Sequence, residues 1–297
     1  MQYDIEHAAF LLRLRGIFNL KARESQGSKK LFIFIAAAIV LIGGIGFAIF
    51  SQGNKEQKVP VLLYHHLLTE KEKDSHPAFK NKGTTLSVEQ FEKQIKYLAD
   101  NNYHTITLKD LEEFTKGKKN LPKKSILITF DDASKSNYVY AYPILKKYKM
   151  HAASFVVTSR LSDKEEKFDS KTVQSLSKSE INKMQDVFEF GSHTNALHKL
   201  EEGKAAILSK KGTEIKQDIS ESQKILKTSY LSYPFGKYNE NAIKALKECK
   251  FHMAFTNSRG YVNQESNMLK VSRFAISPET DIKEFSRIVA GEYENQK

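Results

Sequence analysis

Residues 125–132 read SILITFDD, a run of six residues typical of a buried strand that ends in two adjacent carboxylates. A strand covered by helices on both faces has a continuous apolar run of this kind. Similar short runs recur along the chain, and segments with apolar residues at helical spacing lie between them. This alternation predicts a parallel α/β sheet, and about seven strand–helix repeats in one domain favour a barrel over an open sheet.

The boundaries of the predicted elements follow from where each apolar pattern starts and stops. Ser87 with Gln90 three residues later fits a capping box, and Pro143 marks a kink or a late start in another helix. The predicted strands cover 59–66, 104–108, 125–130, 152–158, 187–193, 230–236, 252–256 and 269–276. The predicted helices cover 87–101, 108–117, 138–150, 178–185, 239–249 and 280–289, and residues 207–226 contain a further long amphipathic helix.

Composition restricts the class of protein and the chemistry of any metal site. The chain has 297 residues with 40% hydrophobic and 28% charged side chains, enough apolar surface for one large domain or two small ones. It has a single cysteine, Cys249, so an intramolecular disulfide and an all-cysteine metal site are both excluded. Any bound metal must therefore be held by His, Asp or Glu. Tryptophan is absent, and 13 Tyr and 19 Phe supply the aromatic surface instead.

A predicted membrane anchor precedes the folded part. Residues 31–50 read LFIFIAAAIVLIGGIGFAIF without a charge, which is long enough as a helix to cross the hydrocarbon layer of roughly 30 Å. Lys29 and Lys30 directly before it predict a cytoplasmic N-terminus. A cleaved signal peptide is the alternative, but the apolar run is long and Ile49 and Phe50 make a poor cleavage context.

These signals predict a single-pass protein of the cell membrane with its catalytic domain outside. The predicted parts are a cytoplasmic segment (1–30), a transmembrane anchor (31–50), a linker (51–58) and an extracellular domain (59–297). Residues 8–18 of the first part either lie on the inner membrane surface or belong to a poorly ordered tail. The net charge of +12 suits anionic polymers or lipid head groups, or reflects an ordinary solvated surface. The lysines are spread evenly, so we expect no nucleic-acid partner, and no protein partner is evident.

Four groups of polar residues end predicted strands, which is where functional side chains gather in parallel barrels. Each group alone has an ordinary explanation as a turn, a loop or a buried pair, but their coincidence favours a site. Two histidines and one carboxylate would leave coordination positions open, as in catalytic metal centres. The four groups are Asp131 and Asp132, His193 and His198, the turn 232–236, and His65 with His66.

TFDD, SHTNALH and SYPFG, in this order, resemble the first three motifs of the polysaccharide deacetylases, carbohydrate esterase family 4 with its NodB homology domain. The resemblance covers roughly residues 59–290. It implies a distorted (β/α) barrel and a divalent metal, usually zinc, with cobalt, manganese and nickel as alternatives. It also implies hydrolysis of the N-acetyl groups of acetylated hexosamine polymers, with release of acetate.

The resemblance also implies a role for individual residues. Asp131 matches the catalytic base of the family. The three residues that match its metal ligands are Asp132, His193 and His198. The loop that walls the acetate pocket and donates a backbone N–H matches Tyr233, Pro234, Phe235 and Gly236, and Leu197 with Phe235 is expected to line the methyl pocket.

Three departures from the common family pattern point to one branch. The two histidines are spaced i, i+5, no Arg precedes the proline turn, and no His follows the last strand. These features resemble the poly-N-acetylglucosamine deacetylases of biofilm formation, in which a Tyr-His pair near the domain start supplies the imidazole. Here that pair is Tyr64 and His65, so His65 is the candidate general acid. Arg273 either pairs with Asp131 in place of the absent Arg or is a surface charge.

The expected substrate is a polysaccharide that contains N-acetylglucosamine. Poly-β-1,6-N-acetylglucosamine is favoured, and peptidoglycan is the alternative, since an anchored enzyme with a basic outer domain would face the cell wall. Two other classes of function stay open at this point. One is a catalytically inactive carbohydrate-binding protein on the same fold, and the other is a metal hydrolase acting on a different acyl, amide or phosphate ester.

Overall fold

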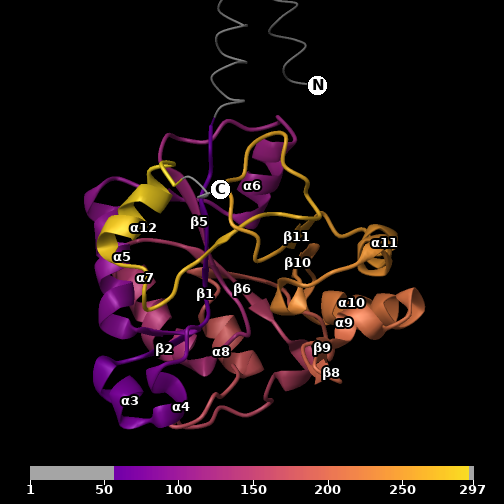
Figure 1. Cartoon of the computed structure of the whole chain (residues 1–297), viewed down its shortest axis with the longest axis horizontal. Coiled ribbons are helices and arrows are strands. Elements are labelled where there is room, and N and C mark those ends of the chain that lie inside the picture. The colour runs from indigo at the N-terminus through magenta and orange to yellow at the C-terminus, as the bar shows by residue number, and fades with distance from the viewer. Residues whose placement is uncertain (1–56, 294–297) are drawn as a thin grey trace, which may run out of the picture. The chain divides into compact units, whose positions relative to one another are not determined.

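A parallel sheet forms the centre of the computed structural model, which describes residues 57–293 (Figure 1). Within this part the sheet has eight strands in the order β11-β10-β7-β6-β5-β1-β12, with β4 pairing to β5, and all pairs are parallel. Its strands are β1 (Val61–Tyr64), β4 (His104–Thr105), β5 (Ser125–Phe130), β6 (Ala152–Val156), β7 (Phe188–Ser192), β10 (Tyr230–Ser232), β11 (Met253–Phe255) and β12 (Phe274–Ala275). Two short ribbons add β2 (His66–Leu68) with β3 (Thr85–Ser87), and β8 (Leu200–Glu201) with β9 (Lys204–Ala205).

The sheet curves far enough that its two ends approach each other. The chain that leads into β12 hydrogen bonds with β11, through the Ala254 N–H to the Met268 carbonyl at 2.8 Å and the Thr256 N–H to the Val271 carbonyl at 2.8 Å. β12 itself pairs with β1 at the other side of the sheet. The predicted parallel α/β architecture is confirmed, in the form of a partial barrel.

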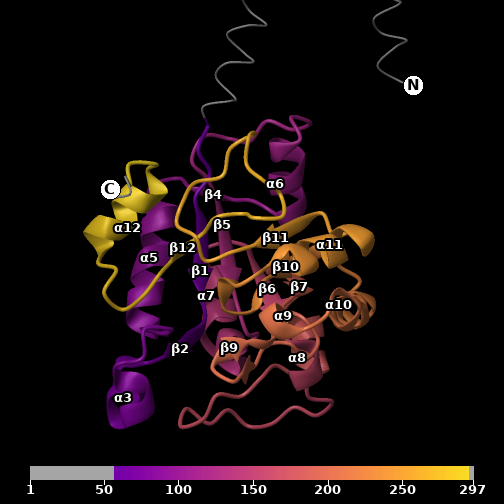
Figure 2. The same ribbon diagram turned by 45° about the vertical axis from the view of Figure 1, so that its right-hand side comes forward.

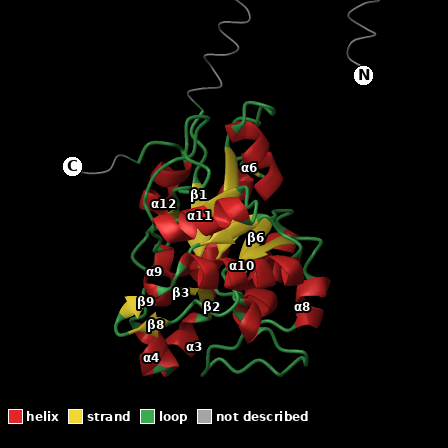
Figure 3. Ribbon diagram, turned by 90° about the vertical axis from the view of Figure 1, so that its right-hand side faces the viewer, coloured by secondary structure: helices red, strands yellow, loops and turns green. Residues whose placement is uncertain are grey.

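Helices cover the outside of the sheet (Figure 3). α5 begins after Ser87, whose hydroxyl accepts from the Gln90 N–H, and α12 lies beside it along one flank (Figure 2). The α-helices are α3 (Glu70–Ser75), α4 (Pro77–Lys80), α5 (Val88–Asp100), α6 (Leu108–Thr115), α7 (Tyr142–Lys147), α8 (Lys178–Lys183), α9 (Ala206–Ser209), α10 (Gly212–Leu226), α11 (Glu240–Glu248) and α12 (Ile282–Val289). Because both faces of β5 are covered, all six of its residues are buried, as the run SILITF predicted.

The structure corrects several predicted boundaries. The strand predicted over 59–66 breaks at His65, because β2 leaves the main sheet to pair with β3. The long helix predicted within 207–226 is confirmed as α10, and the short helix α9 precedes it, with Lys210 and Lys211 extended between the two. The strand predicted over 269–276 is reduced to β12.

Two further details concern helix starts. Pro143 stands in the first turn of α7, which continues a short π-helix (Asn137–Ala141) without a break. The capping box predicted from Ser87 and Gln90 is only half formed. The Gln90 amide instead donates to the carbonyls of Pro278 and Thr280, at 3.2 and 3.0 Å.

The predicted anchor cannot be compared with the structure. Residues 1–30 and 31–50, and most of the predicted linker 51–58, lie outside the described residues. Among residues 57–293, none of the helices combines the length and the apolar character that crossing a membrane requires.

Candidate active site and metal centre

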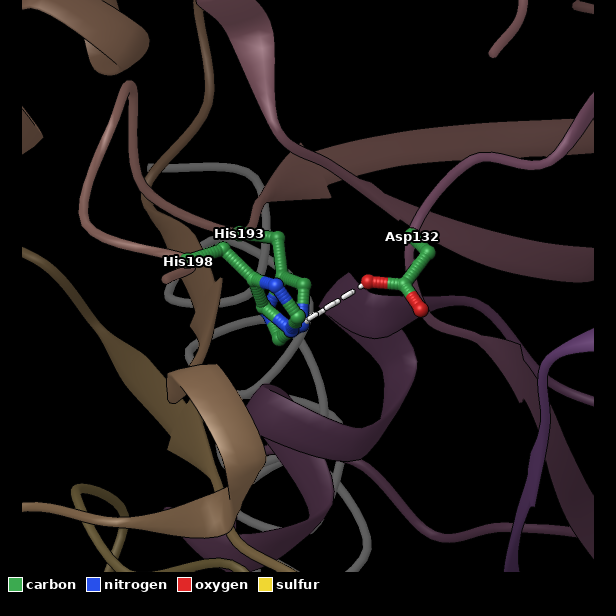
Figure 4. Close-up of side chains that lie close together, drawn as sticks. All are labelled: Asp132, His193 and His198. Atoms are coloured by element: carbon green, nitrogen blue, oxygen red, sulfur yellow. Dashed lines mark ion pairs between the residues drawn. The ribbon is translucent and has the colours of Figure 1, made fainter. Parts of the chain in front are cut away.

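Two adjacent carboxylates end β5 and take different partners. Asp132 and the following Ala133 have φ angles of 71° and 48°, a left-handed conformation that side chains other than glycine adopt at a cost. This sharp turn lets Asp131 stay buried while Asp132 is partly exposed. Figure 4 shows the Asp132 carboxylate facing the rings of His193 and His198.

Asp132, His193 and His198 form a cluster that could hold one metal ion. The Asp132 Oδ1 atom lies 3.7 Å from His193 Nε2 and 3.3 Å from His198 Nε2, and all three ligand atoms lie within 4.8 Å of one another. The same Oδ1 atom is buried and has no hydrogen-bond partner among the described residues. Nitrogen and carboxylate ligands bind zinc at about 2.0–2.2 Å, so donors spaced in this way fit around one ion. The donor set therefore suits a catalytic divalent cation with open positions.

Both histidines present Nε2 toward this cluster. The Nδ1–H of His193 donates to the Ser232 carbonyl at 2.7 Å, which leaves Nε2 free for a ligand bond. Burial, and then the neighbouring His193, lower the pKa of His198 to about 4. A neutral imidazole at neutral pH is the form that binds a metal. Arg160 fixes the backbone here, since its guanidinium donates to the His198 carbonyl at 2.6 Å.

The loop that carries the two histidines is anchored by hydrogen bonds to α10. Asp218 on that helix accepts from the backbone N–H groups of Asn195 and Ala196, both at 2.8 Å. The Asn195 side chain in turn accepts from the Thr158 hydroxyl at 2.8 Å. Thr194 adopts a left-handed φ of 70° at the bend. The spacing i, i+5 is thus accommodated by a tight, anchored loop.

Arg273 holds the candidate base in place. Its Nη1 and Nη2 atoms donate to the two oxygens of Asp131, both at 2.8 Å, and Nη2 also lies 2.8 Å from the Ser232 hydroxyl oxygen. That hydroxyl donates to Asp131 Oδ2 at 3.0 Å. Burial would raise the pKa of Asp131, but the Arg273 guanidinium and the His193 ring outweigh burial and hold the pKa well below its usual range. Asp131 is therefore an anion at neutral pH.

Arg273 is itself completely buried, so the alternative that it is a surface charge is wrong. Its guanidinium lies 5.8 Å from the ring centres of Phe155 and Phe255. Its Nε atom donates to the Thr256 carbonyl at 2.9 Å, and Nη2 donates to the Asn257 side chain at 3.1 Å. A buried cation needs this complete set of acceptors, because an uncompensated one would be strongly destabilising.

His65 and His66 have different surroundings. His65 lies at the break between β1 and β2, and burial lowers its pKa, while the charges of Asp131 and Asp132 oppose that shift. His66 is buried against the Phe79 ring, 5.2 Å between ring centres, and its Nδ1 atom lies 3.4 Å from the Thr85 hydroxyl. The first histidine of the pair therefore interacts with the two carboxylates at the end of β5, whereas the second packs in the β2–β3 ribbon.

The turn after β10 lies against the candidate metal ligands. Phe235 has a φ of 57° and its ring packs on His198 at 4.3 Å between ring centres. Gly236, at φ 68°, is required here, because a Cβ atom would lie 2.6 Å from the Asn257 side chain. Tyr233 is buried and its hydroxyl donates to the Leu269 carbonyl at 3.0 Å, so this side chain supports the turn from behind. Leu197 packs in the same hydrophobic cluster as Tyr233.

Sequence reasoning missed several residues that support this site. Ser232 is within the motif SYPFG but was not singled out, although it contacts both Arg273 and Asp131. Asn257 and Asp218 carry no sequence signal, because each is an isolated polar residue whose partners are distant along the chain.

Comparisons with known proteins agree with this geometry. Residues 118–254 match the family model of polysaccharide deacetylase. The poly-beta-1,6-N-acetyl-D-glucosamine N-deacetylase of Staphylococcus aureus (strain MSSA476) is 32% identical over 205 residues, 66% of this chain and 69% of that protein. The protein of the same name from Staphylococcus epidermidis is 30% identical over 216 residues, 69% of this chain and 73% of that one.

A solved structure supports the fold. The Streptococcus pyogenes deacetylase PplD in complex with acetate superimposes with a TM-score of 0.67 at 21% identity, over 78% of this chain and 98% of that one. The partial parallel barrel is therefore a deacetylase fold. With the relatives above, the chain belongs to the polysaccharide deacetylase family, and the resemblance seen in its motifs is confirmed.

Proposed function

We propose that this enzyme removes N-acetyl groups from the N-acetylglucosamine units of a cell-surface polysaccharide, with poly-β-1,6-N-acetylglucosamine as the favoured polymer. The observation that carries the proposal is a group of three candidate metal ligands beside a buried, ionised carboxylate. Asp131 Oδ2 lies 4.0 Å from His193 Nε2, so the base and the cluster act on the same small volume. The substrate printed in the names of the two staphylococcal relatives supports the choice of polymer.

The donor set predicts which group the site would hold and which chemistry it supplies. A divalent cation on Asp132, His193 and His198, zinc by preference, would supply a Lewis acid for the acetyl carbonyl and an acidified water. Cobalt, manganese and nickel suit the same mixture of nitrogen and oxygen donors.

The residues of this chain divide the remaining work. Asp131, held as an anion by Arg273, accepts the proton of the attacking water. The backbone N–H at Phe235, in the strained turn, is the candidate donor to the oxyanion that forms on the acetyl carbonyl. His65 is the candidate donor of a proton to the leaving amine. The products are acetate and a free amino sugar, so water supplies the oxygen that enters acetate and the proton that the amine gains.

Two alternatives, peptidoglycan as the substrate and an inactive carbohydrate-binding role, can be distinguished from this proposal by experiment. Peptidoglycan offers the same N-acetylglucosamine group in another polymer. An inactive carbohydrate-binding protein has no need for a buried base next to three ligands, and this pairing argues against that role. Mass spectrometry of poly-β-1,6-N-acetylglucosamine and of peptidoglycan, each incubated with the full chain in detergent, tests the proposal. We expect acetyl loss from the first polymer; loss from peptidoglycan alone would overturn the choice of substrate.

We further propose that the enzyme is anchored in the cell membrane by residues 31–50 with its catalytic domain outside. The uncharged run and the basic residues before it support this topology. Protease treatment of intact cells should then cleave the catalytic domain. A domain that stays intact until the cells are lysed would contradict the topology.

A further inference from the structure

The turn that presents Asp132 to the two histidines is bonded to a distant segment of the chain. Asp132 and Ala133 are both left-handed, and such a turn keeps its shape only when the surrounding structure holds it. The segment that leads into α8 supplies two backbone hydrogen bonds. The Leu176 N–H donates to the Ala133 carbonyl at 3.0 Å. The Lys135 N–H donates to the Gln174 carbonyl at 2.8 Å, so the turn is held against the chain that precedes α8.

A buried ion pair adds a third connection between the turn and α8. The Lys135 ammonium group pairs with Glu180 Oε1, and the two side chains are 5% and 2% exposed. The other oxygen of Glu180 accepts from the Ser177 N–H at 2.8 Å and from the Ser177 hydroxyl at 2.9 Å, within the capping box that starts α8. Both oxygens of Glu180 therefore have partners, and this carboxylate fixes the position of the Lys135 ammonium group.

Stability alone is a weak reason for a buried ion pair at this place. Moving two charges out of water costs free energy, and well-packed apolar side chains in place of such a pair are often equally stable. An ion pair differs from an apolar contact because it fixes the position of both charged groups. Lys135 comes three residues after Asp132, so fixing its side chain restricts the conformation of the turn between them.

The two adjacent carboxylates differ in what holds them. The oxygens of Asp131 accept from Arg273 and from the Ser232 hydroxyl, which come from other parts of the sheet. Asp132 Oδ1, in contrast, has no hydrogen-bond partner among the described residues. The direction of Asp132 toward the two histidines therefore depends on the backbone of its own turn.

We propose that Lys135 and Glu180 are positioning residues that direct Asp132 toward the metal and thereby set the metal affinity of the site. They act through the left-handed turn and do not belong to the group of candidate ligands. Without the pair, the turn relaxes toward commoner backbone conformations and Asp132 Oδ1 moves away from the histidine nitrogens, while Asp131 stays with Arg273. This inference rests on the proposed function, because it takes Asp132 as a metal ligand.

The test measures the zinc affinity of the full chain in detergent, by competition with a chelator of known affinity. The test variant combines Lys135→Met with Glu180→Gln, which removes both charges and keeps an acceptor for the Ser177 N–H. Lys135→Met alone is unsuitable, because a carboxylate buried without a cation is strongly destabilising by itself. The control variant combines Lys116→Met with Glu112→Gln, and so removes another Lys–Glu pair with a buried carboxylate, at the amino end of the sheet.

We expect the test variant to bind zinc about tenfold more weakly than wild type, at the lower end of what losing an outer contact of a metal ligand costs. The control should bind zinc as wild type does. Turnover of the test variant at saturating zinc should stay close to wild type, because Asp131 and Arg273 are unchanged. The visible spectrum of the cobalt-loaded protein, which depends on ligand geometry, should change in the test variant only.

Thermal unfolding of the metal-free proteins separates this role from a purely structural one. Equal zinc affinity of wild type and test variant would overturn the proposal, whatever the unfolding temperatures, because the pair would then act on stability alone. An equal loss of affinity in both variants, or a test variant that is unfolded at the assay temperature, would overturn it too, since the effect would not be specific to Asp132.

The same measurements distinguish this inference from the proposed function. A wild-type chain that binds zinc but releases no acetate from any polymer would overturn the proposed function alone, because zinc affinity is measured without turnover. A wild-type chain that binds no zinc would overturn both.

Discussion

Buried charges lie at both ends of the sheet, and the two ends use them differently. At the amino ends of β10 and β11, Glu112 Oε2 accepts from the Tyr230 hydroxyl at 2.7 Å and lies 3.2 Å from His252 Nδ1, while Oε1 pairs with Lys116. At the carboxyl end of β5, Asp132 Oδ1 is buried without a hydrogen bond. One carboxylate is fully occupied by the protein, and the other faces two imidazoles that also present free nitrogens.

Backbone strain follows the same division. Asp132, Ala133, Thr194 and Phe235, all next to the metal cluster, have left-handed φ angles between 48° and 71°. At the amino ends, Asn102, Lys149, Lys227 and Lys250 are left-handed just after α5, α7, α10 and α11, where this conformation is common, and Lys124 is left-handed in the turn before β5. At the stabilising end of this sheet, the oxygens of the buried carboxylate all have protein partners. At the reactive end, a carboxylate oxygen without a partner lies on a turn with left-handed φ angles.

The largest expected effect comes from removing a metal ligand. His198→Ala should lose bound metal and acetate release together, because one carboxylate and one imidazole are too few to hold a zinc ion in a catalytic site. Metal content by mass spectrometry and acetate release on the same sample check this. Retention of stoichiometric metal with near-normal turnover would contradict the ligand assignment.

Asp131→Asn should separate catalysis from metal binding. The variant keeps Asp132 and both histidines, so metal content should match wild type, while turnover should fall by about 10²–10⁴-fold, the usual value of general-base catalysis. A loss of metal that accompanies the loss of turnover would mean that Asp131 is a ligand rather than the base.

His65→Ala should have a smaller effect on turnover. Since His65 is only partly buried, water can replace it as proton donor to the leaving amine, and we expect a loss near the lower limit of about 10²-fold with metal retained. His66→Ala is the matched control, because that ring packs against Phe79 within the β2–β3 ribbon. Normal turnover in His65→Ala and none in His66→Ala would reverse the assignment.

The amino end of the sheet should affect stability and leave activity unchanged. Burial raises the pKa of Glu189 above its usual 4.5; the Leu108 N–H and His151 oppose the rise, and Asp110 adds to it. Between 4.5 and the raised value the folded state binds more protons at this site, so its contribution to stability falls as pH rises. Glu189→Gln, which keeps an acceptor for the Leu108 N–H, should therefore unfold at a higher temperature than wild type at neutral pH.

Well below pH 4.5 the two proteins should unfold at the same temperature, because the carboxyl group is then neutral in both the folded and the unfolded state. Acetate release at neutral pH should be unchanged. A loss of activity in this variant would contradict the division between the two ends.

The residues that end strands could be predicted from sequence because strand ends are a local signal. The run SILITF fixed β5 in full, and the carboxylates and histidines that follow β5 and β7 lie together as expected. For Arg273, the sequence left two alternatives open, a pair with Asp131 or a surface charge. Its pairing with Asp131 joins residues 142 positions apart, and its burial depends on acceptors such as Thr256 and Asn257 that carry no pattern of their own.

Other features depended on tertiary contacts that the sequence does not record. The first strand breaks at His65 because β2 finds a partner in β3, and this pairing separates His65 from His66. The half-formed cap at Ser87 has the same origin, since Gln90 bonds to the loop before α12 instead of to its own helix end.

Zinc-dependent acetate release from poly-β-1,6-N-acetylglucosamine tests the central claim most directly. The wild-type chain and Asp132→Asn would be stripped with a chelator and titrated with zinc while released acetate is measured. We predict no release from either stripped protein, full recovery of wild type, and partial recovery of Asp132→Asn at much higher zinc. Release that continues without metal, or an Asp132→Asn variant that recovers at the same zinc concentration as wild type, would contradict the claim that the open carboxylate at the end of β5 is a metal ligand.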